Sequence, residues 1–451
     1  MKRIALVVVV LALVVAVALP PLFGARARAI TDADLAAIGD AFAPYGTLDV
    51  SLEDWDVGWY SSTATASIHL DFAGRPDLPA ALLDVPPFNR TFPQLVTLHH
   101  GPIILPQAGL GWGGVELAID ASVVPELEGF QDATGVEYLL RLDILVGFLG
   151  GASLAMDVPA FVYEWQDTRF DFQGFEVNAS ADARGQHVGI DGEIGGFSVS
   201  EQGSQSVTVN RIDWSGTARK DLRILQLWLG GGRLDIDRIA VTGDGIPANF
   251  DVSDIVVEGG IEADEDSYVV TGSFGVGEVG IADLRLNDFA AGLAMRCGPE
   301  TMALISDSPY DVGALDPEVQ AALAEALLRE RFQFEIDRFG FRYGARSASA
   351  TLAFEYRGDE LPDGVEVGGT MDLALLEPLV SARVGMAFHK ELMGGLGVDQ
   401  LDGWVRILAQ EGILRESGDD YTLDVELDSG TLTVNGEPFE PWALLGLLSG
   451  L

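Results

Sequence analysis

The chain has 451 residues, of which 48% are hydrophobic and 21% charged, and its 69 acidic and 27 basic side chains give a net charge of −42. This hydrophobic content is enough for a large buried core and excludes a disordered acidic tail. The negative charge excludes nucleic acid as a partner, because a surface that binds nucleic acid needs clustered lysine and arginine.

The first 29 residues follow the order of a bacterial export segment. Lys2 and Arg3 precede an apolar run over residues 4–19, and prolines and a tail of alanines and arginines follow. This order is typical of a signal sequence. The run is shorter than the ~20 residues of a membrane-spanning helix, so an uncleaved anchor in the inner membrane and a cleaved signal peptide are both open. In either case we expect the rest of the chain on the periplasmic side of the inner membrane.

Alternating apolar and polar residues predict strands along most of the remaining chain. Residues 64–72, 136–144 and 421–427 carry aliphatic or aromatic side chains at alternate positions and mostly polar or charged ones between them. A period of two places the two kinds of side chain on opposite faces of a strand. The pattern therefore predicts antiparallel sheets with one solvated face.

A long meander is predicted between about residues 160 and 295. Short strand-like runs follow each other there, separated by glycine, aspartate and asparagine. The glycines at 195–196, 230–232, 243–245 and 259–260 are expected to supply tight turns, because glycine adopts positive φ without steric cost.

Four helices are expected. A capping pattern at Thr31 precedes an amphipathic stretch to Phe42, and Asp316-Pro317 provides an N-cap and a first-turn proline for a helix ending near Arg331. Helical spacing of apolar residues also indicates helices over residues 398–413 and 441–448.

The fold class predicted from these elements is mainly β (α+β). It consists of elongated, curved antiparallel sheets in a meander, a few amphipathic helices and an N-terminal membrane helix. We divide the chain into the membrane anchor or signal peptide over 1–29, a β-rich meander region over 30–295, and a mixed α/β region over 296–451 that belongs to the same body.

Three separated segments resemble the YdgA-like family of bacterial inner-membrane or periplasmic envelope proteins, a domain family without an assigned biochemical function. They are LEDWDVGWYSS over residues 52–62, HHGP over residues 99–102 and GTLTVNG over residues 430–436. Together with the N-terminal segment and a helix in the last third, their order covers nearly the whole chain. The resemblance implies a protein associated with the inner membrane or the periplasm.

Motifs for catalysis or cofactor binding are weak. Residues 275–280 have G-x-G-x-x-G spacing, but the residues after them alternate like a strand, so the helix that would hold a pyrophosphate is not expected. No G-x-S-x-G elbow occurs, and the one cysteine, Cys297, is expected to be a small buried hydrophobe. The acidic turn at 262–266 offers oxygen donors for calcium without the spacing of a calcium loop. We therefore expect no catalytic, cofactor or metal residues.

The local element singled out as a candidate is His100-Gly101-Pro102. It is either a polar contact to a ligand or the end of a strand, where a glycine turn and a proline direct the next segment.

We conclude that this is a non-enzymatic protein of the cell envelope that binds or shields an apolar ligand, a lipid, along one face of a sheet. Its partners are then the inner membrane, through the N-terminal segment, and a lipid. Two alternatives remain: a structural or interaction module that meets a protein or a second copy, and a hydrolase.

Overall fold

The structure is a computed structural model of the whole chain. It describes residues 47–57, 61–71, 89–100, 111–120, 130–147, 151–165, 167–201, 205–243, 249–282, 284–306, 317–358, 377–395 and 399–439. Contacts divide the chain into two units, Met1–Gln202 and Gly203–Leu451, and each is described by itself.

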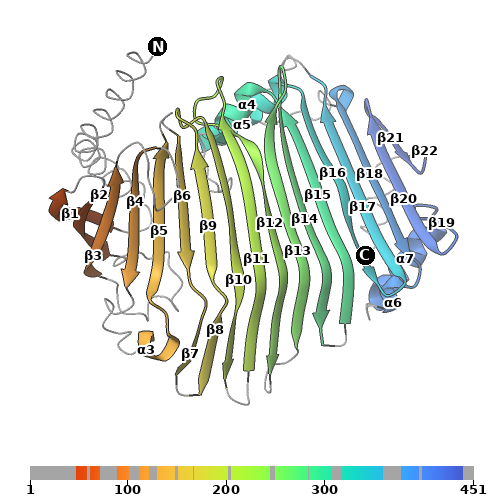
Figure 1. Ribbon diagram of the computed structural model, residues 1–451. Helices are drawn as coiled ribbons and strands as arrows, with labels where there is room; N and C mark the ends of the chain where they lie inside the picture. Colours follow the sequence, from red (N-terminus) through yellow and green to blue (C-terminus); the bar gives the residue numbers. More distant parts are fainter. Residues whose placement is uncertain are drawn as a thin grey trace, which may run out of the picture. The chain divides into compact units, whose positions relative to one another are not determined.

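The first unit is an antiparallel sheet in which the first six strands pair in chain order (Figure 1). Its helix and strands are β1 (Thr47–Val57), β2 (Ser61–Asp71), β3 (Asn89–His100), β4 (Gly111–Asp120), α3 (Phe130–Thr134), β5 (Tyr138–Gly147), β6 (Ala152–Val158), β7 (Phe161–Trp165), β8 (Thr168–Phe172), β9 (Phe175–Ala181) and β10 (His187–Glu201).

Two of the long strands in this unit are interrupted. β6 and β7 pair with β9 and β8, and β10 pairs with both β9 and β8. The break between β8 and β9 falls at Gly174, which has a φ of +96°, a backbone conformation that favours glycine. One core cluster of this unit lies on β2 and β3, where Ala64, Ala66, Val96 and Leu98 are buried, and a second lies around Phe130 and Val136.

The second unit is also an antiparallel meander, built from longer strands (Figure 1). Its elements are β11 (Gln205–Lys220), β12 (Trp228–Gly243), β13 (Phe250–Ala263), β14 (Tyr268–Ile281), β15 (Leu284–Cys297), α4 (Pro299–Ser306), α5 (Pro317–Arg329), β16 (Phe332–Tyr343), β17 (Arg346–Tyr356), the 3-10 helix η5 (Glu377–Leu379), β18 (Val380–His389), α6 (Leu392–Gly395), α7 (Asp399–Gln410), β19 (Arg415–Ser417), β20 (Asp420–Asp428), β21 (Thr431–Val434) and β22 (Glu437–Pro438).

Helix α4 covers one end of this second sheet. Its Met302 packs against Leu229, Tyr268 and Cys297, which come from β12, β14 and β15. The chain after α5 holds α4 in place, because the Glu330 carboxylate accepts hydrogen bonds from the amides of residues 300 and 301, each at 3.0 Å. A carboxylate at a helix N-terminus satisfies amides that have no partner within the helix.

Helices α6 and α7 cover the other end of the strands from β16 to β20. Leu392 of α6 and Val405 of α7 form a buried cluster with Phe388 and Leu414. The two groups of helices therefore lie over opposite ends of the strands, and the rows of residues between them form the middle of the sheet.

Most of the predicted elements are confirmed among the described residues. The three alternating segments correspond to β2, β5 and β20, and two of the expected helices are α5 and α7. Cys297 is buried, with 1% of its surface exposed. The helices expected at 31–42 and 441–448 lie outside the described residues.

The glycine-rich turns were a wrong prediction at most positions. The pairs at 195–196 and 259–260 and the run at 230–232 lie inside β10, β13 and β12, and the glycines of residues 275–280 lie inside β14. The strands are accordingly 14 to 16 residues long. Neighbouring backbones come close at several of these sites: a Cβ on Gly260 would lie 2.8 Å from the Gly230 carbonyl oxygen.

The predicted membrane segment over 1–29 lies outside the described residues. Across the ranges given above, no helix is both long and apolar enough to cross a bilayer. The boundary expected at 295/296 falls inside β15, within the second unit, and β15 pairs there with β16 from the other side of the expected boundary.

Candidate functional site

His100 is the last residue of β3 and pairs with Gly113 of β4. Gly101 and Pro102 lie outside the described residues, so a role for this element in ligand contact stays a prediction. The preceding residue, His99, places its Nε2 atom 3.4 Å from Oε2 of Glu116.

Glu116 belongs to a polar network that crosses β3, β4 and β5. Arg141 contacts Glu116 at 3.3 Å and donates through Nε to Asp143 at 3.1 Å. The Asp143 carboxylate is the main cause that raises the pKa of Arg141. Because the arginine lies between two carboxylates, the network is a set of ion pairs rather than a free acid or base.

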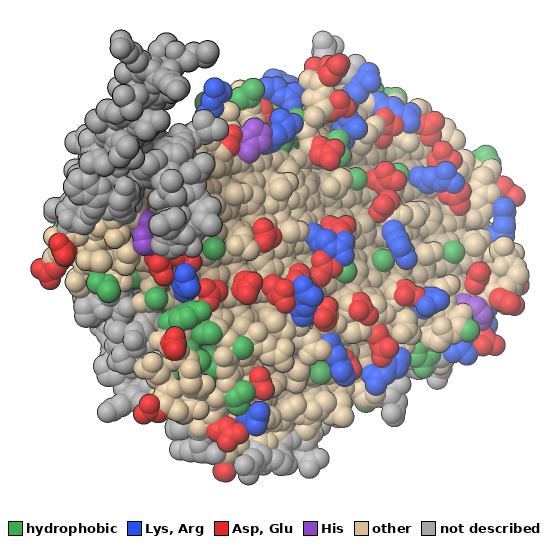
Figure 2. Space-filling model, viewed as in Figure 1, with side chains coloured by type: hydrophobic (Ala, Val, Ile, Leu, Met, Phe, Trp, Pro, Cys, Tyr) green, Lys and Arg blue, Asp and Glu red, His purple; other side chains and the backbone are tan. Residues whose placement is uncertain are grey.

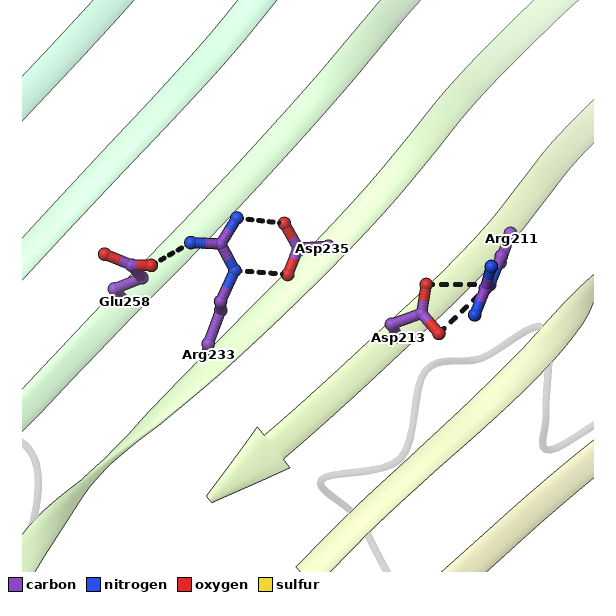
Figure 3. A network of polar contacts seen from close by, with 5 residues as sticks. All are labelled: Arg211, Asp213, Arg233, Asp235 and Glu258. Atoms are coloured by element: carbon purple, nitrogen blue, oxygen red, sulfur yellow. Dashed lines mark hydrogen bonds and ion pairs between the residues drawn. The ribbon is translucent and has the colours of Figure 1, made fainter. Parts of the chain in front are cut away.

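One face of the second unit carries charges of both signs, visible in Figure 2 as acidic side chains with basic ones among them. Arg233 donates to both oxygens of Asp235 at 2.6 Å and also to Glu258 on the next strand (Figure 3). Arg211 makes the same pairing with Asp213, two positions along β11, at 2.9 Å. Exposed pairs of this kind contribute little to stability, typically about 0–1 kcal/mol each.

Arginine side chains contact the acidic turn at 262–266. Arg296 contacts the Asp264 carboxylate at 3.2 Å, and Arg223 donates to the carbonyl oxygens of Asp264 and Glu265. Among the residues that the structure describes, no group of three or more histidine, cysteine or acidic side chains is placed to hold a metal ion.

A buried tyrosine and aspartate lie under α4. The Tyr268 hydroxyl donates to Asp221 at 2.6 Å, and the Arg223 guanidinium lies over the Tyr268 ring at 4.6 Å. Burial and the Asp221 carboxylate raise the pKa of Tyr268 to about 12, and burial, with a contribution from Glu330, raises the pKa of Cys297 to about 11. Both groups stay protonated at neutral pH, so this cluster offers neither a phenolate nor a thiolate.

The opposite face of the second sheet is apolar from β11 to β20. Directly paired residues of antiparallel strands project to the same face, and one such row crosses six strands. It consists of Val257, Phe274, Ala291, Phe339, Ala350 and Met386.

The large side chains of this row are partly open to solvent. The exposed fractions are 39% for Val257, 40% for Phe274, 45% for Phe339 and 41% for Met386. Phe289 joins two of them, with ring centroids 5.8 Å from Phe274 and 5.6 Å from Phe339 in edge-to-face geometry. Contiguous apolar surface of this kind on a folded protein marks an interaction site more often than scattered single residues do.

A row of glycines runs beside these side chains, and we call it the glycine row. Gly216, Gly232, Gly259 and Gly272 pair in succession across β11, β12, β13 and β14, on the same face as Val257 and Phe274 by strand alternation. A Cβ on Gly232 or Gly259 would meet only the backbone of a neighbouring strand within 4 Å, so no side chain covers the row there.

Larger side chains border the glycine row on both sides and at one end. The row of Ile261, Val270 and Met295 lies on one side, and the row of Val257 and Phe274 lies on the other. Leu293 of β15 pairs with Gly272 and closes the row, and its side-chain carbons lie 3.5–3.8 Å from the position of a Cβ on Gly272. The arrangement is a shallow apolar furrow that runs across the strands.

Alternation along single strands predicts an apolar sheet face but does not locate it. Neighbouring residues of the row are 11 to 48 positions apart in the chain, and only the strand register aligns them. The glycine clusters could be seen in the sequence. Their recurrence at similar places in successive strands was a signal that could have located this face.

The chain belongs to a family of bacterial proteins of unknown function, DUF945, which matches residues 1–441. Neither the curated proteins nor the solved structures contain a match. The family assignment agrees with the bacterial domain of unknown function expected from the sequence, while the closer link to the YdgA-like proteins stays a prediction.

Proposed function

We propose that this protein is a non-enzymatic component of the bacterial cell envelope that binds the acyl chain of a lipid on the apolar face of the second unit. The observation that carries the proposal is the row of half-exposed Val257, Phe274, Phe339 and Met386 in the middle of that face. Burial of a lipid chain stabilises a complex by about 0.8 kcal/mol for each CH₂ group removed from water.

The glycine row supports an elongated ligand rather than a compact one. Its floor is backbone, its walls are aliphatic and aromatic, and it crosses β11 to β14. A linear hydrocarbon fits this shape without requiring a hydrogen bond. The export pattern of residues 1–29 supports a place on the periplasmic side of the inner membrane, and the three family-like segments support a YdgA-like envelope role.

The test is a substitution that fills the furrow. We expect Gly272→Val to weaken binding of a neutral monoacylglycerol, labelled in its acyl chain with a conjugated polyene, by about tenfold or more, which corresponds to about 1.4 kcal/mol. The strand tolerates the change, because a Cβ at this position makes ordinary contacts with Leu293 and β-branched residues suit strands. Fluorescence titration measures the affinity.

Gly275→Val is the matched control. Gly275 lies on the same strand, on the charged face, and its nearest atom to a new Cβ is the Phe289 carbonyl oxygen at 3.9 Å. This variant should bind as the unaltered protein does, within about twofold. Equal affinity of both variants, or no binding to the unaltered protein and no lipid in mass spectra after gentle purification, contradicts the proposal.

A further inference from the structure

A separate pocket of about 340 Å³ lies in the first unit. It is formed where β5, β6, β7 and β8 approach α3, and its nine lining residues include Phe130, Tyr138, Leu139, Phe161, Tyr163 and Phe170. The volume is within the range of small-molecule sites. The pocket is independent of the apolar face of the second unit, because its lining comes from the first unit alone.

Aromatic rings make up more than half of this lining, and they meet in the geometries that rings prefer. The centroid of Phe130 lies 5.1 Å from that of Phe161, edge to face, and 5.3 Å from that of Tyr163. Phe161 continues the cluster to Phe170 at 5.7 Å. Ring pairs with centroids 4.5–7 Å apart in these arrangements attract each other beyond the effect of burial, so a further ring in the pocket finds partners of the same kind.

None of the nine lining residues carries a charge. The Tyr138 hydroxyl donates to Oδ2 of Asp157 at 2.7 Å, so this polar lining group already has a partner in the protein. An ion bound here would lose its hydration without gaining an opposite charge from the lining. The lining chemistry therefore selects a neutral ligand.

The volume limits the size of that ligand. A dry cavity of about 150 Å³ lined by aliphatic and aromatic side chains holds one benzene molecule, and this pocket is roughly twice as large. We infer that the pocket binds a neutral, compact aromatic molecule of about two fused rings. In Figure 2 hydrophobic side chains gather at the lower left of the visible face, in the region of β5 to β7.

The experiment titrates the full chain with 2-naphthol by calorimetry. Leu139→Trp fills the pocket and should weaken 2-naphthol binding by about tenfold or more. The control is Leu145→Trp on the same strand, because Leu145 pairs with Gly114 and Ser153 and does not line the pocket. This control, and Gly272→Val in the second unit, should change the affinity by less than about twofold.

A second variant separates aromatic recognition from general apolarity. Phe170→Leu keeps an apolar side chain but removes one ring, so 2-naphthol binding should weaken by about two- to tenfold while binding of 1-decanol stays within about twofold. Circular dichroism shows whether Leu139→Trp folds. If it does not fold, Phe170→Leu still tests the inference. The inference is wrong if 2-naphthol does not bind, if filling the pocket leaves its affinity unchanged, or if Phe170→Leu weakens both probes equally.

Discussion

Asp221 is an acidic residue with only 4% of its surface exposed, a position that costs free energy unless the carboxylate is fully hydrogen-bonded. Burial alone would raise its pKa, but hydrogen bonds from the Tyr268 hydroxyl and the Arg223 amide, together with the Arg223 charge, bring the pKa of Asp221 below its usual value. The residue ties the connection between β11 and β12 to β14, next to the cluster that α4 covers.

Asp221→Asn should lower the free energy of unfolding at pH 7 by about 3 kcal/mol, because a buried group loses its charge-assisted hydrogen bonds. Urea denaturation measures this difference. Asp213→Asn, in an exposed pair with Arg211, is the control and should cost less than about 1 kcal/mol.

The same residue sets a pH dependence. Because the folded state lowers the pKa of Asp221, its contribution is complete above the unfolded pKa of about 3.9 and is lost as the pH falls through the lower folded value. The difference between the unaltered protein and Asp221→Asn should therefore shrink below about pH 4. A difference that stays constant from pH 7 to pH 3 would mean that the charge of Asp221 does not contribute.

At the scale of elements, a glycine inside a strand can change which of its neighbouring side chains is buried. Gly230 has a φ of +147°, and in the residues just before it Leu229 rather than Trp228 is buried, although strict alternation from Leu234 would bury Trp228. The glycine thus shifts which side chain faces α4. Its Cβ position would collide with the backbone of residues 217 and 218 on β11.

Gly230→Ala should lower the free energy of unfolding by about 1–3 kcal/mol, because alanine is strained at this φ and its methyl group meets backbone that cannot move aside. Thermal unfolding of this variant and of Gly275→Ala, where the space is open, provides the comparison. Equal stability of the two variants would show that the strand adjusts at residue 230 without cost.

Strand identity could be predicted from local patterns, as β2, β5 and β20 show, and so could α5, from its N-cap and proline. The place of the glycines inside strands could not be predicted, because glycine is a turn signal when only its neighbours in sequence are known. Whether it ends a strand or admits a neighbouring backbone depends on register, as for Gly260 beside Gly230. An apolar sheet face was predicted, but the residues that form it were not. Residues such as Val257 and Phe339 are brought together only by pairing across several strands.

For the whole molecule, the net charge of −42 is the dominant electrostatic feature. Arginines on the described strands pair with carboxylates, as Arg233 and Arg383 do, but acidic residues far outnumber them. The excess negative charges repel one another and oppose folding, and dissolved salt screens this repulsion.

We expect the melting temperature at pH 7 to rise when NaCl is increased from about 10 mM to about 150 mM, because the Debye length falls from about 30 Å to about 8 Å. Differential scanning calorimetry measures the shift. At pH 4, where many carboxylates are protonated, the rise should be smaller. A melting temperature that falls with salt would mean that the ion pairs outweigh the repulsion.

If a lipid chain binds in the glycine row as proposed, the orientation of the row limits the length of that chain. A ligand lying in the row crosses strands rather than following one, so each strand that it passes adds about 4.8 Å to the hydrocarbon it accommodates. The limit is set in discrete steps, by the strand on which a side chain such as Leu293 first replaces a glycine. Chain-length selectivity would then change through single glycine gains and losses on successive strands, without any change in the fold.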